Sequence, residues 1–255
     1  MAVSRTQIVD ENFMRFVAQR PAAPRRVDLD APVRPGAALT ARDAVRLFEA
    51  QIESRICDFV SRELKAEGQS YYTIGSSGHE GNAAVADVLT PEDFAFLHYR
   101  SGAFFCARAA KTPGPEGAFD VLLGAVASID EPVAGGRHKV FGSVRLNIPP
   151  QTSTIASQLP KALGFAVASD RRARLERVAA HRIAMCSFGD ASANHATAVA
   201  AINSACWCSY QRVPAPVLFV CEDNGFGISV RTPQGWIATN FSSRPGLAYF
   251  EANGC

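Results

Sequence analysis

Two apolar runs that each end in a polar turn decide the fold of this chain. The first, RIAMCSFGDAS, covers residues 182–192, and the second, VLFVCEDNGFG, covers residues 217–227. Short apolar runs of this kind are typical of parallel strands that are covered on both faces. Between them, small and apolar residues recur at helical spacing from Ser192 to about Tyr210. The pattern therefore predicts a strand, a helix and a second strand.

A right-handed crossover would bring both polar turns to one edge of a parallel sheet, where such folds bind ligands. In the first turn, Gly189 permits a sharp bend, and Ser192 is expected to cap the following helix, whose free N–H groups suit an anion. A hard cation such as Mg2+ takes carboxylate, amide and carbonyl oxygens. We therefore predict a cation site made by Asp190, Asn224 and the carbonyl of Phe226.

The composition is that of an ordinary globular protein. The chain has 255 residues, of which 47% are hydrophobic and 20% charged, enough for one large α/β domain with a sizeable core. A net charge of +2, without a basic patch interleaved with aromatic residues, gives no indication of nucleic-acid binding. Seven scattered cysteines, no signal-peptide core and no membrane-spanning run predict reduced thiols and a cytoplasmic location.

The chain is expected to divide near residue 40. Residues 1–39 are rich in proline and contain a short helical pattern around residues 9–19, which predicts an extended strap or linker. Residues 40–255 are expected to form the main domain, opening with a long helix to about residue 68 that Thr40 and Asp43 cap. We expect one apolar stripe of this helix to be core or subunit contact: Val45, Phe48, Ile52, Ile56, Phe59 or Val60, and Leu64.

Further candidate ligand residues follow a strand predicted over residues 94–97. Arg100 stands at the carboxyl end of this strand and suits bidentate phosphate binding, and Tyr99 beside it can pack on a ligand. The alternative is a surface arginine. Upstream, Gly78-His79-Glu80 lies in a turn of small residues before a helix predicted to reach Leu89, and this turn could hold an anion or only cap that helix.

Two other segments carry chemistry-bearing side chains. Residues 135–142 form a basic, glycine-rich loop that contains His138. Two interpretations stay open: a solvated surface loop and an active-site loop. Residues 151–158 hold more hydroxyl groups than a helix cap needs. Residues 169–182 are expected to be a basic, exposed helical turn. The remaining histidines considered, His79, His181 and His195, are expected to be structural or on the surface.

The two polar turns resemble the thiamine diphosphate motif, which reads Gly-Asp-Gly and, after an interval, Asn-Asn. Ala191 replaces the third glycine and Asp223 the first asparagine, whereas the metal-ligating positions Asp190 and Asn224 are retained. The long helix, Gly-His-Glu, Tyr-Arg, the histidine loop and the Ser-x-Ile turn precede them in order. Residues 40–255 thereby resemble the α subunit, or α half, of the thiamine diphosphate-dependent decarboxylating component of 2-oxo acid dehydrogenase complexes, branched-chain type.

This resemblance implies an α/β fold in which a parallel sheet has helices on both faces, preceded by the N-terminal strap and the long helix. It also implies roles for single residues. His138 would be catalytic, and Mg2+ would be held by Asp190, Asn224 and Phe226. The cofactor would contact Tyr99, Arg100, Ser153, Ile155, Gly189, Asp190, Ala191, Ser192, Asn224 and Phe226. A structural monovalent cation such as K+, which some members bind, would lie at Thr152, Ser157 and Gln158.

The implied activity is oxidative decarboxylation of a branched-chain 2-oxo acid or pyruvate, with acyl transfer to a lipoyl-bearing acyltransferase component. The base that activates the cofactor belongs to the β subunit or a C-terminal β half. We therefore expect a fragment, or the front of an α–β fusion, acting in an α2β2-like heterotetramer.

Other functions stay open at this point. One is a transketolase-like or acetoin-cleaving thiamine diphosphate enzyme, and another is a non-catalytic interaction or regulatory remnant. A Rossmann dinucleotide site is disfavoured, because residues 223–227 lack the third glycine and the helix of that motif.

Overall fold

The computed structural model describes residues 5–20, 28–71, 73, 75–114, 116–137, 142–151, 153–178 and 182–254. The chain divides into two compact units, residues 1–45 and residues 46–255. The assignment of a strap to residues 1–39 and a cofactor domain to residues 40–255 stays a prediction.

The first unit contains helix α1 (Arg5–Gln19), which is longer than predicted, and the start of α2 (Ala41–Ala66). Thr40 and Asp43 form the expected cap. The backbone N–H and the hydroxyl of Thr40 donate to Asp43 Oδ2 at 3.1 and 2.7 Å, and the Asp43 N–H donates to Thr40 Oγ1 at 3.2 Å. These bonds satisfy N–H groups that have no partner within the first turn, and they explain why α2 begins here.

The buried face of α2 is not the apolar stripe that the sequence pattern indicated. Phe48 and Ile56 are 49% and 52% exposed, so these two residues do not enter the core, and the alternative of a subunit contact stays a prediction. Small and polar residues pack instead because they allow close approach: a Cβ built on Gly102 would lie 2.5 Å from Ser54 Oγ. The buried residues of α2 are Leu47, Ala50, Ser54, Cys57, Asp58 and Ser61.

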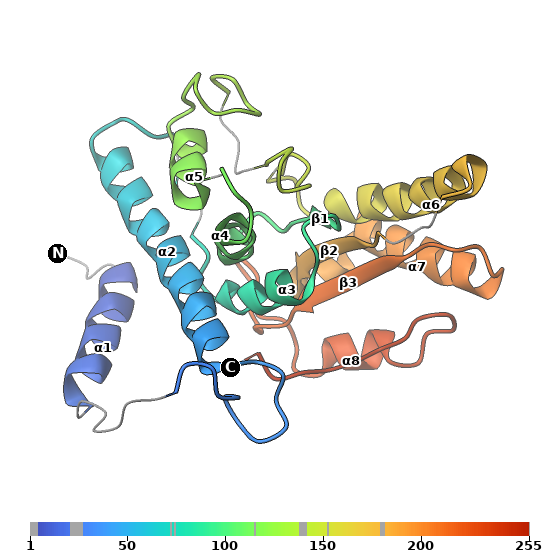
Figure 1. The fold of residues 1–255 in the computed structure, drawn as a ribbon, viewed down its shortest axis with the longest axis horizontal. Coiled ribbons are helices and arrows are strands. Elements are labelled where there is room, and N and C mark those ends of the chain that lie inside the picture. The colour runs from blue at the N-terminus through green and yellow to red at the C-terminus, as the bar shows by residue number, and fades with distance from the viewer. Residues whose placement is uncertain are drawn as a thin grey trace. The chain divides into compact units, whose positions relative to one another are not determined.

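Within the described residues, three parallel strands form the predicted parallel sheet, in the order β1-β2-β3 (Figure 1). They are β1 (Phe94–Phe96), β2 (Ala184–Gly189) and β3 (Val217–Glu222). Phe96 pairs with Cys186, and Gly189 pairs with Glu222. Every residue of the central strand β2 is buried, which explains its almost wholly apolar sequence.

The other regular elements described in the second unit are all helices. The predicted helix ending at Leu89 is split into a short 3-10 helix and an α-helix, whereas the helix between β2 and β3 lies close to its predicted place. Their bounds are η1 (Glu80–Asn82), α3 (Ala83–Val88), α4 (Gly102–Ala110), α5 (Gly117–Ala125), α6 (Gln158–Glu176), η2 (Asp190–Asn194), α7 (Ala196–Tyr210) and α8 (Trp236–Phe241).

The two sides of β2 face different layers. Ala184, Cys186 and Phe188 belong to one core cluster with residues of α6, α7 and α8. The Ser187 hydroxyl instead contacts the Ser101 hydroxyl at 3.1 Å, immediately before α4. Figure 1 shows α6 and α7 to the right of the sheet and α3 and α4 to its left. The sheet is therefore flanked by helices, in agreement with the predicted fold class.

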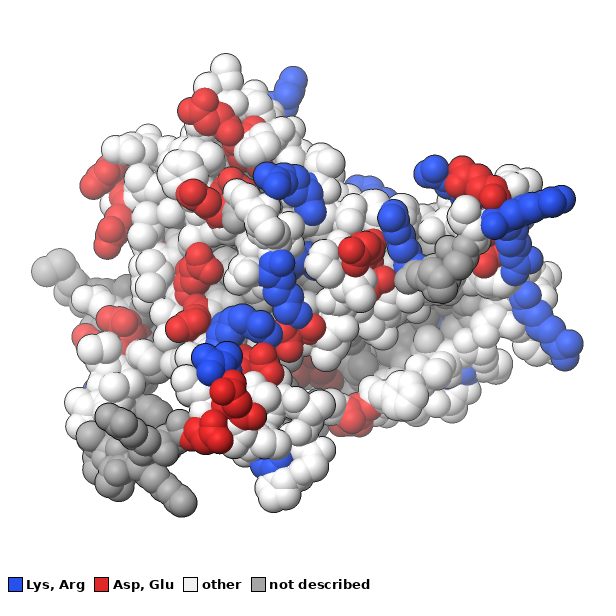
Figure 2. Space-filling view, viewed as in Figure 1, with Lys and Arg blue, Asp and Glu red and all other residues white. Residues whose placement is uncertain are grey.

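Helix α6 runs through much of the segment that was expected to be a connecting turn. It continues to Glu176, and ion pairs one helical turn apart join Arg172 to Glu176 at 2.8 Å and Arg174 to Asp170 at 2.9 Å. Such pairs support the exposed end of a helix. Figure 2 shows basic side chains gathered over this end of the second unit.

The thiols of the described cysteines are free: Cys57, Cys106, Cys186, Cys206, Cys208 and Cys221. Burial raises the pKa of Cys57 to about 12, so this thiol stays protonated and acts as a packing group. Within the described part of the chain, none of the helices combines the length and the apolarity that crossing a bilayer requires. The cytoplasmic location stays a prediction.

Candidate functional site

The carboxyl ends of the three strands meet at one edge of the sheet. The segment after β1 carries Tyr99 and Arg100, β2 is followed by Asp190, and β3 ends in Glu222, two residues before Asn224. Residues distant in sequence therefore become neighbours at the edge where parallel sheets bind ligands. The predicted meeting of the two polar turns is observed.

Asp190 joins these two turns. Its side chain is 1% exposed, and its two oxygens accept from different segments. Oδ1 accepts from the Ala191 N–H at 2.9 Å, and Oδ2 accepts from the Gly225 N–H at 3.0 Å. Gly225 has a φ of +73°, a conformation that glycine adopts at low cost. Backbone bonds to a carboxylate are strong, so they hold the Asp190 carboxylate in one position.

Asn224 supplies the amide of the predicted cation site. Its Oδ1 accepts from the Phe226 N–H at 3.0 Å. Its Nδ2 lies 3.4 Å from the Gly78 carbonyl oxygen and 3.5 Å from His79 Nε2. The amide is thus held from both sides, on a turn that directly contacts Asp190.

Asp223 is a further acidic group beside Asp190. Burial, together with a hydrogen bond to Asp190 and its charge, raises the pKa of Asp223 above its ordinary value. A divalent cation bound between two carboxyl groups would reduce their mutual repulsion. The donor set of Asp190, Asn224 and the Phe226 carbonyl therefore fits a hard cation such as Mg2+.

The segment after Asp190 differs from the prediction. The chain forms η2 there, and α7 begins only at Ala196. The expected helix cap at Ser192 was wrong, because the Ser192 hydroxyl donates to the Gly189 carbonyl at 2.8 Å. The cap is His195, whose Nδ1 accepts from the Thr197 N–H at 3.2 Å. Ser192 instead closes the turn that carries Asp190.

Tyr99 and Arg100 lie at the same edge of the sheet. Tyr99 is 8% exposed, and the Arg100 guanidinium carbon lies 5.0 Å from the centroid of its ring. Arg100 Nη1 donates to the Gly75 carbonyl at 2.7 Å. The arginine is therefore fixed between β1 and the turn that leads to His79, where its charge can attract an anion.

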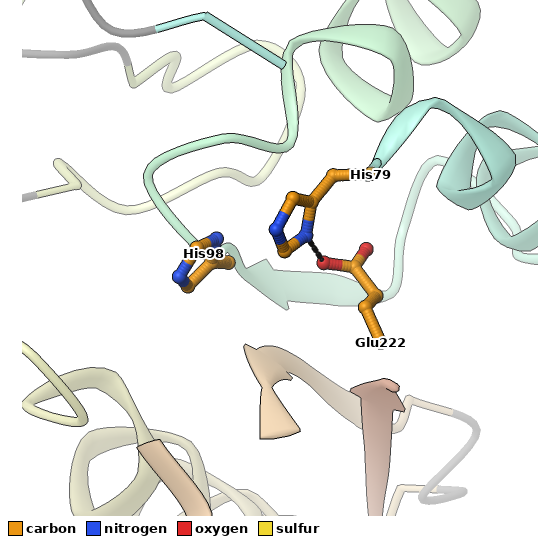
Figure 3. Close-up of side chains that lie close together, drawn as sticks. All are labelled: His79, His98 and Glu222. Carbon is orange, nitrogen blue, oxygen red and sulfur yellow. Dashed lines mark hydrogen bonds and ion pairs between the residues drawn. The ribbon is translucent and has the colours of Figure 1, made fainter. Parts of the chain in front are cut away.

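A buried group of side chains beside Asn224 was missed by the sequence reasoning (Figure 3). His79, expected to be structural or exposed, is 6% exposed, and its Nδ1 contacts Glu222 Oε2. The His98 ring stacks on it with centroids 4.7 Å apart and planes inclined by 17°. Burial, with the nearby His79 and Arg100, lowers the pKa of His98 to about 3, so His98 is neutral. The sequence features that could have predicted this group are the Gly-His-Glu turn and the acidic residue at the end of β3.

The segment expected to contact the aminopyrimidine lies on the α6 side of the sheet. Ile155 is half-buried and packs against the core cluster, whereas Ser153 is exposed. Thr152 and the proposed catalytic His138 lie outside the described residues.

The polar groups expected to hold a monovalent cation have bonds within the protein. The Ser157 hydroxyl donates to the Thr154 carbonyl at 3.0 Å, which serves the local turn. Gln158 Nε2 donates to the Ser187 carbonyl at 3.0 Å and so ties α6 to β2. Gln158 Oε1 is buried and has no partner within the described structure. The cation site stays a prediction.

Comparison with known families agrees with this arrangement. Residues 49–250 match the family model described as "Dehydrogenase E1 component". The chain belongs to the dehydrogenase E1 component family. The parallel sheet of the second unit is consistent with the cofactor-binding domain of E1 proteins.

Several E1 relatives are α subunits of one enzyme. The mitochondrial 2-oxoisovalerate dehydrogenase subunit alpha of Caenorhabditis elegans is 26% identical over 192 residues, which cover 75% of this chain and 41% of that protein. The Mus musculus subunit is 24% identical over 209 residues, covering 81% and 43%. The Bacillus subtilis subunit is 27% identical over 210 residues, covering 81% and 58%. The resemblance to branched-chain α subunits is confirmed, and the chain spans about half the length of these relatives.

Proposed function

We propose that this chain supplies the Mg2+ and diphosphate half-site of a thiamine diphosphate-dependent 2-oxo acid dehydrogenase. The observation that carries the proposal is the contact between the buried Asp190 and the 223–227 turn, at the carboxyl ends of two adjacent parallel strands. Membership of the E1 family and the names of the relatives support it.

Asp190, Asn224 and the carbonyl of Phe226 would hold Mg2+. These are the oxygen types that Mg2+ prefers. Because the protein would supply only a few ligands, the other coordination positions of Mg2+ would stay open to water and phosphate oxygens. The repulsion between Asp190 and Asp223 would also be relieved by the cation. Gly189, Ala191 and Ser192 would line the diphosphate, because the turn they form is the one that positions Asp190.

Arg100 and Tyr99 would bind the anionic end of the cofactor. Arg100 is held at the sheet edge by Gly75 and by the Tyr99 ring, so its charge is positioned before the ligand arrives. Ser153 and Ile155 would contact the aminopyrimidine end, with His138 as the catalytic histidine. A K+ site at Thr152, Ser157 and Gln158 belongs to the same proposal.

Thiamine diphosphate, when bound, supplies the electron sink that decarboxylation of a 2-oxo acid needs. The substrate would be a branched-chain 2-oxo acid, since the relatives are 2-oxoisovalerate dehydrogenase subunits. A β subunit or β half would complete the site in a heterotetramer, and a lipoyl-bearing acyltransferase would accept the acyl group. The residues described here would bind and orient the cofactor.

Calorimetric titration of thiamine diphosphate in the presence of Mg2+ tests the site. We expect Asp190→Ala to weaken binding about 100-fold or more, because it removes a carboxylate donor. Glu176→Ala, on the exposed end of α6, is the matched control and should bind like the wild type. Wild-type binding that persists in Asp190→Ala would refute the metal assignment.

Product analysis separates the enzyme classes. With a β partner present, the proposed enzyme should release carbon dioxide from branched-chain 2-oxo acids in the presence of a lipoyl acceptor. Turnover of sugar phosphates or acetoin in its place would identify a transketolase-like or acetoin-cleaving enzyme. A complex that binds the cofactor and turns over none of these would support the non-catalytic alternative.

A further inference from the structure

The orientation of the Asn224 amide is determined by two backbone groups. The Phe226 N–H, 3.0 Å away, can only donate, so it requires the amide oxygen on its side. The Gly78 carbonyl, 3.4 Å from the other end of the amide, can only accept, so it requires Nδ2. The Asn224 NH2 group is therefore the end of the amide that faces His79.

This orientation determines the tautomer of His79. An NH2 group only donates, so His79 Nε2, 3.5 Å from Asn224 Nδ2, must be an acceptor without a proton. The ring proton is then on Nδ1, which contacts the Glu222 carboxylate and donates to it. His79 thus links an acidic group to an amide.

Glu222 also accepts a hydrogen bond from Asn82, and the direction of that bond is fixed in the same way. The Phe104 N–H in α4 donates to Asn82 Oδ1 at 2.8 Å, which directs Asn82 Nδ2 to Glu222 Oε1, also at 2.8 Å. Every donor and acceptor from Phe104 to Asn224 is therefore assigned. His79 and Asn82 are 6% and 4% exposed, and the Glu222 side chain is 10% exposed, so water competes little for these bonds.

The geometry does not favour a metal ion within this cluster, although donor atoms of His79, His98 and Glu222 lie within 4.8 Å of one another. The two imidazole rings are stacked nearly parallel, so their lone pairs do not converge on one point. Both Glu222 oxygens already accept hydrogen bonds. The His98 ring instead covers one face of His79 and confines it (Figure 3).

We propose that His79 is a positioning residue that holds the Asn224 amide so that its oxygen, and never its NH2 group, faces the cation. This inference rests on the proposed function, because it takes Asn224 as a ligand of Mg2+. An amide that rotates freely would present NH2 to the cation part of the time, and a donor group repels a cation. Without His79, only the bond from the Phe226 N–H and the long contact to Gly78 would oppose that rotation.

The test compares two substitutions of His79. Glutamine carries a donor nitrogen and an acceptor oxygen on one planar group, so His79→Gln can bridge Glu222 and Asn224, whereas His79→Phe keeps the ring and has neither. We expect His79→Phe to weaken Mg2+ binding about 10- to 100-fold in calorimetry with thiamine diphosphate present, and His79→Gln to recover most of it. His195→Phe, which removes the cap of α7, controls for lost stability and should leave Mg2+ affinity unchanged.

Nitrogen NMR of the wild type gives a readout that needs no bound cofactor. We expect the His79 signals to show Nδ1 as the hydrogen-bond donor and Nε2 as the acceptor. A proton on Nε2, Mg2+ affinity within twofold of wild type in His79→Phe, or His79→Gln no better than His79→Phe would each overturn the role of His79 alone. Absence of Mg2+ and cofactor binding in the wild type would overturn the proposed function, and with it this inference.

Discussion

A Cβ atom built on Gly227 would lie 2.9 Å from the Cβ of Ala191. Real side-chain atoms do not approach so closely, so the 223–227 turn and the turn after β2 touch because residue 227 has no side chain. The same contact brings Asn224 next to Asp190, whose Oδ2 accepts from the Gly225 N–H at 3.0 Å. The proposed cation site would thus depend on a glycine that contributes no donor atom.

We predict that Gly227→Ala separates the turns. Overpacking of this kind destabilises proteins by about 1–3 kcal/mol, and we expect Mg2+-dependent cofactor affinity to fall about tenfold as the oxygen donors move apart. Urea unfolding and calorimetry measure the two effects. Gly254→Ala, where no atom lies within 4 Å of the added Cβ, is the control. Equal affinity in the two variants would show that the turns need not touch.

His98 should make stability depend on pH. Its pKa is lowered to about 3 in the folded state by burial and by His79 and Arg100, whereas an unfolded histidine has a pKa of about 6.5. The unfolded state therefore binds more protons, and stability falls as the pH drops below about 6.5, by at most about 1.4 kcal/mol per pH unit from this group. Removing the imidazole in His98→Phe should abolish this part of the dependence.

Urea unfolding of wild type and His98→Phe between pH 7.5 and pH 4.5 measures it. The free-energy difference between the two proteins should shift in favour of the variant as the pH falls. Other titrating groups, including Asp223, are common to both proteins and largely cancel. A difference independent of pH would mean that His98 is protonated as readily in the folded state as in the unfolded one.

Gly164→Ala should stabilise the protein. Gly164 lies in the middle of α6, is exposed, and has no atom within 4 Å of an added Cβ. Alanine in a helix interior is more favourable than glycine by about 1 kcal/mol. We expect a higher urea midpoint with an unchanged slope. A lower midpoint would indicate that α6 is not helical at this residue in solution.

Arg108 should be essential for stability. It is 1% exposed, and its Nη1 donates to the carbonyls of Asp93 at 2.7 Å and Leu146 at 3.1 Å, joining the segment before β1 to the loop before α6. Burial lowers its pKa to about 10, so it is charged at neutral pH. Arg108→Ala leaves a cavity and two buried carbonyls without this donor, a loss of about 3–5 kcal/mol.

Thermal and urea unfolding of Arg108→Ala and Arg108→Lys test this role. Lysine keeps the charge and can reach one carbonyl, so it should restore only part of the stability. Destabilisation below about 1 kcal/mol in the alanine variant would show that water replaces the guanidinium at both carbonyls.

The order of elements, the parallel sheet and the meeting of Asp190 with the 223–227 turn could be predicted from the sequence, because they depend on local pattern and on the chirality of strand–helix–strand units. The Thr40–Asp43 cap could be predicted for the same reason: its partners are three residues apart. Family likeness added Tyr99 and Arg100, whose place at the sheet edge the structure bears out.

Only the tertiary structure decided three features. They are the buried face of α2, the capping role of His195, and the hydrogen bonds that His79 makes to Glu222 and Asn224. Ser54 became core because the glycine opposite allows close approach, and the Ser192 hydroxyl went to the Gly189 carbonyl rather than to a helix end. His79 and Glu222 are 143 residues apart in the sequence, and no spacing rule relates them. The sequence by itself determined which oxygens reach the sheet edge. Only folding determined which neighbours hold them, since burial and hydrogen-bond direction depend on contacts between distant segments.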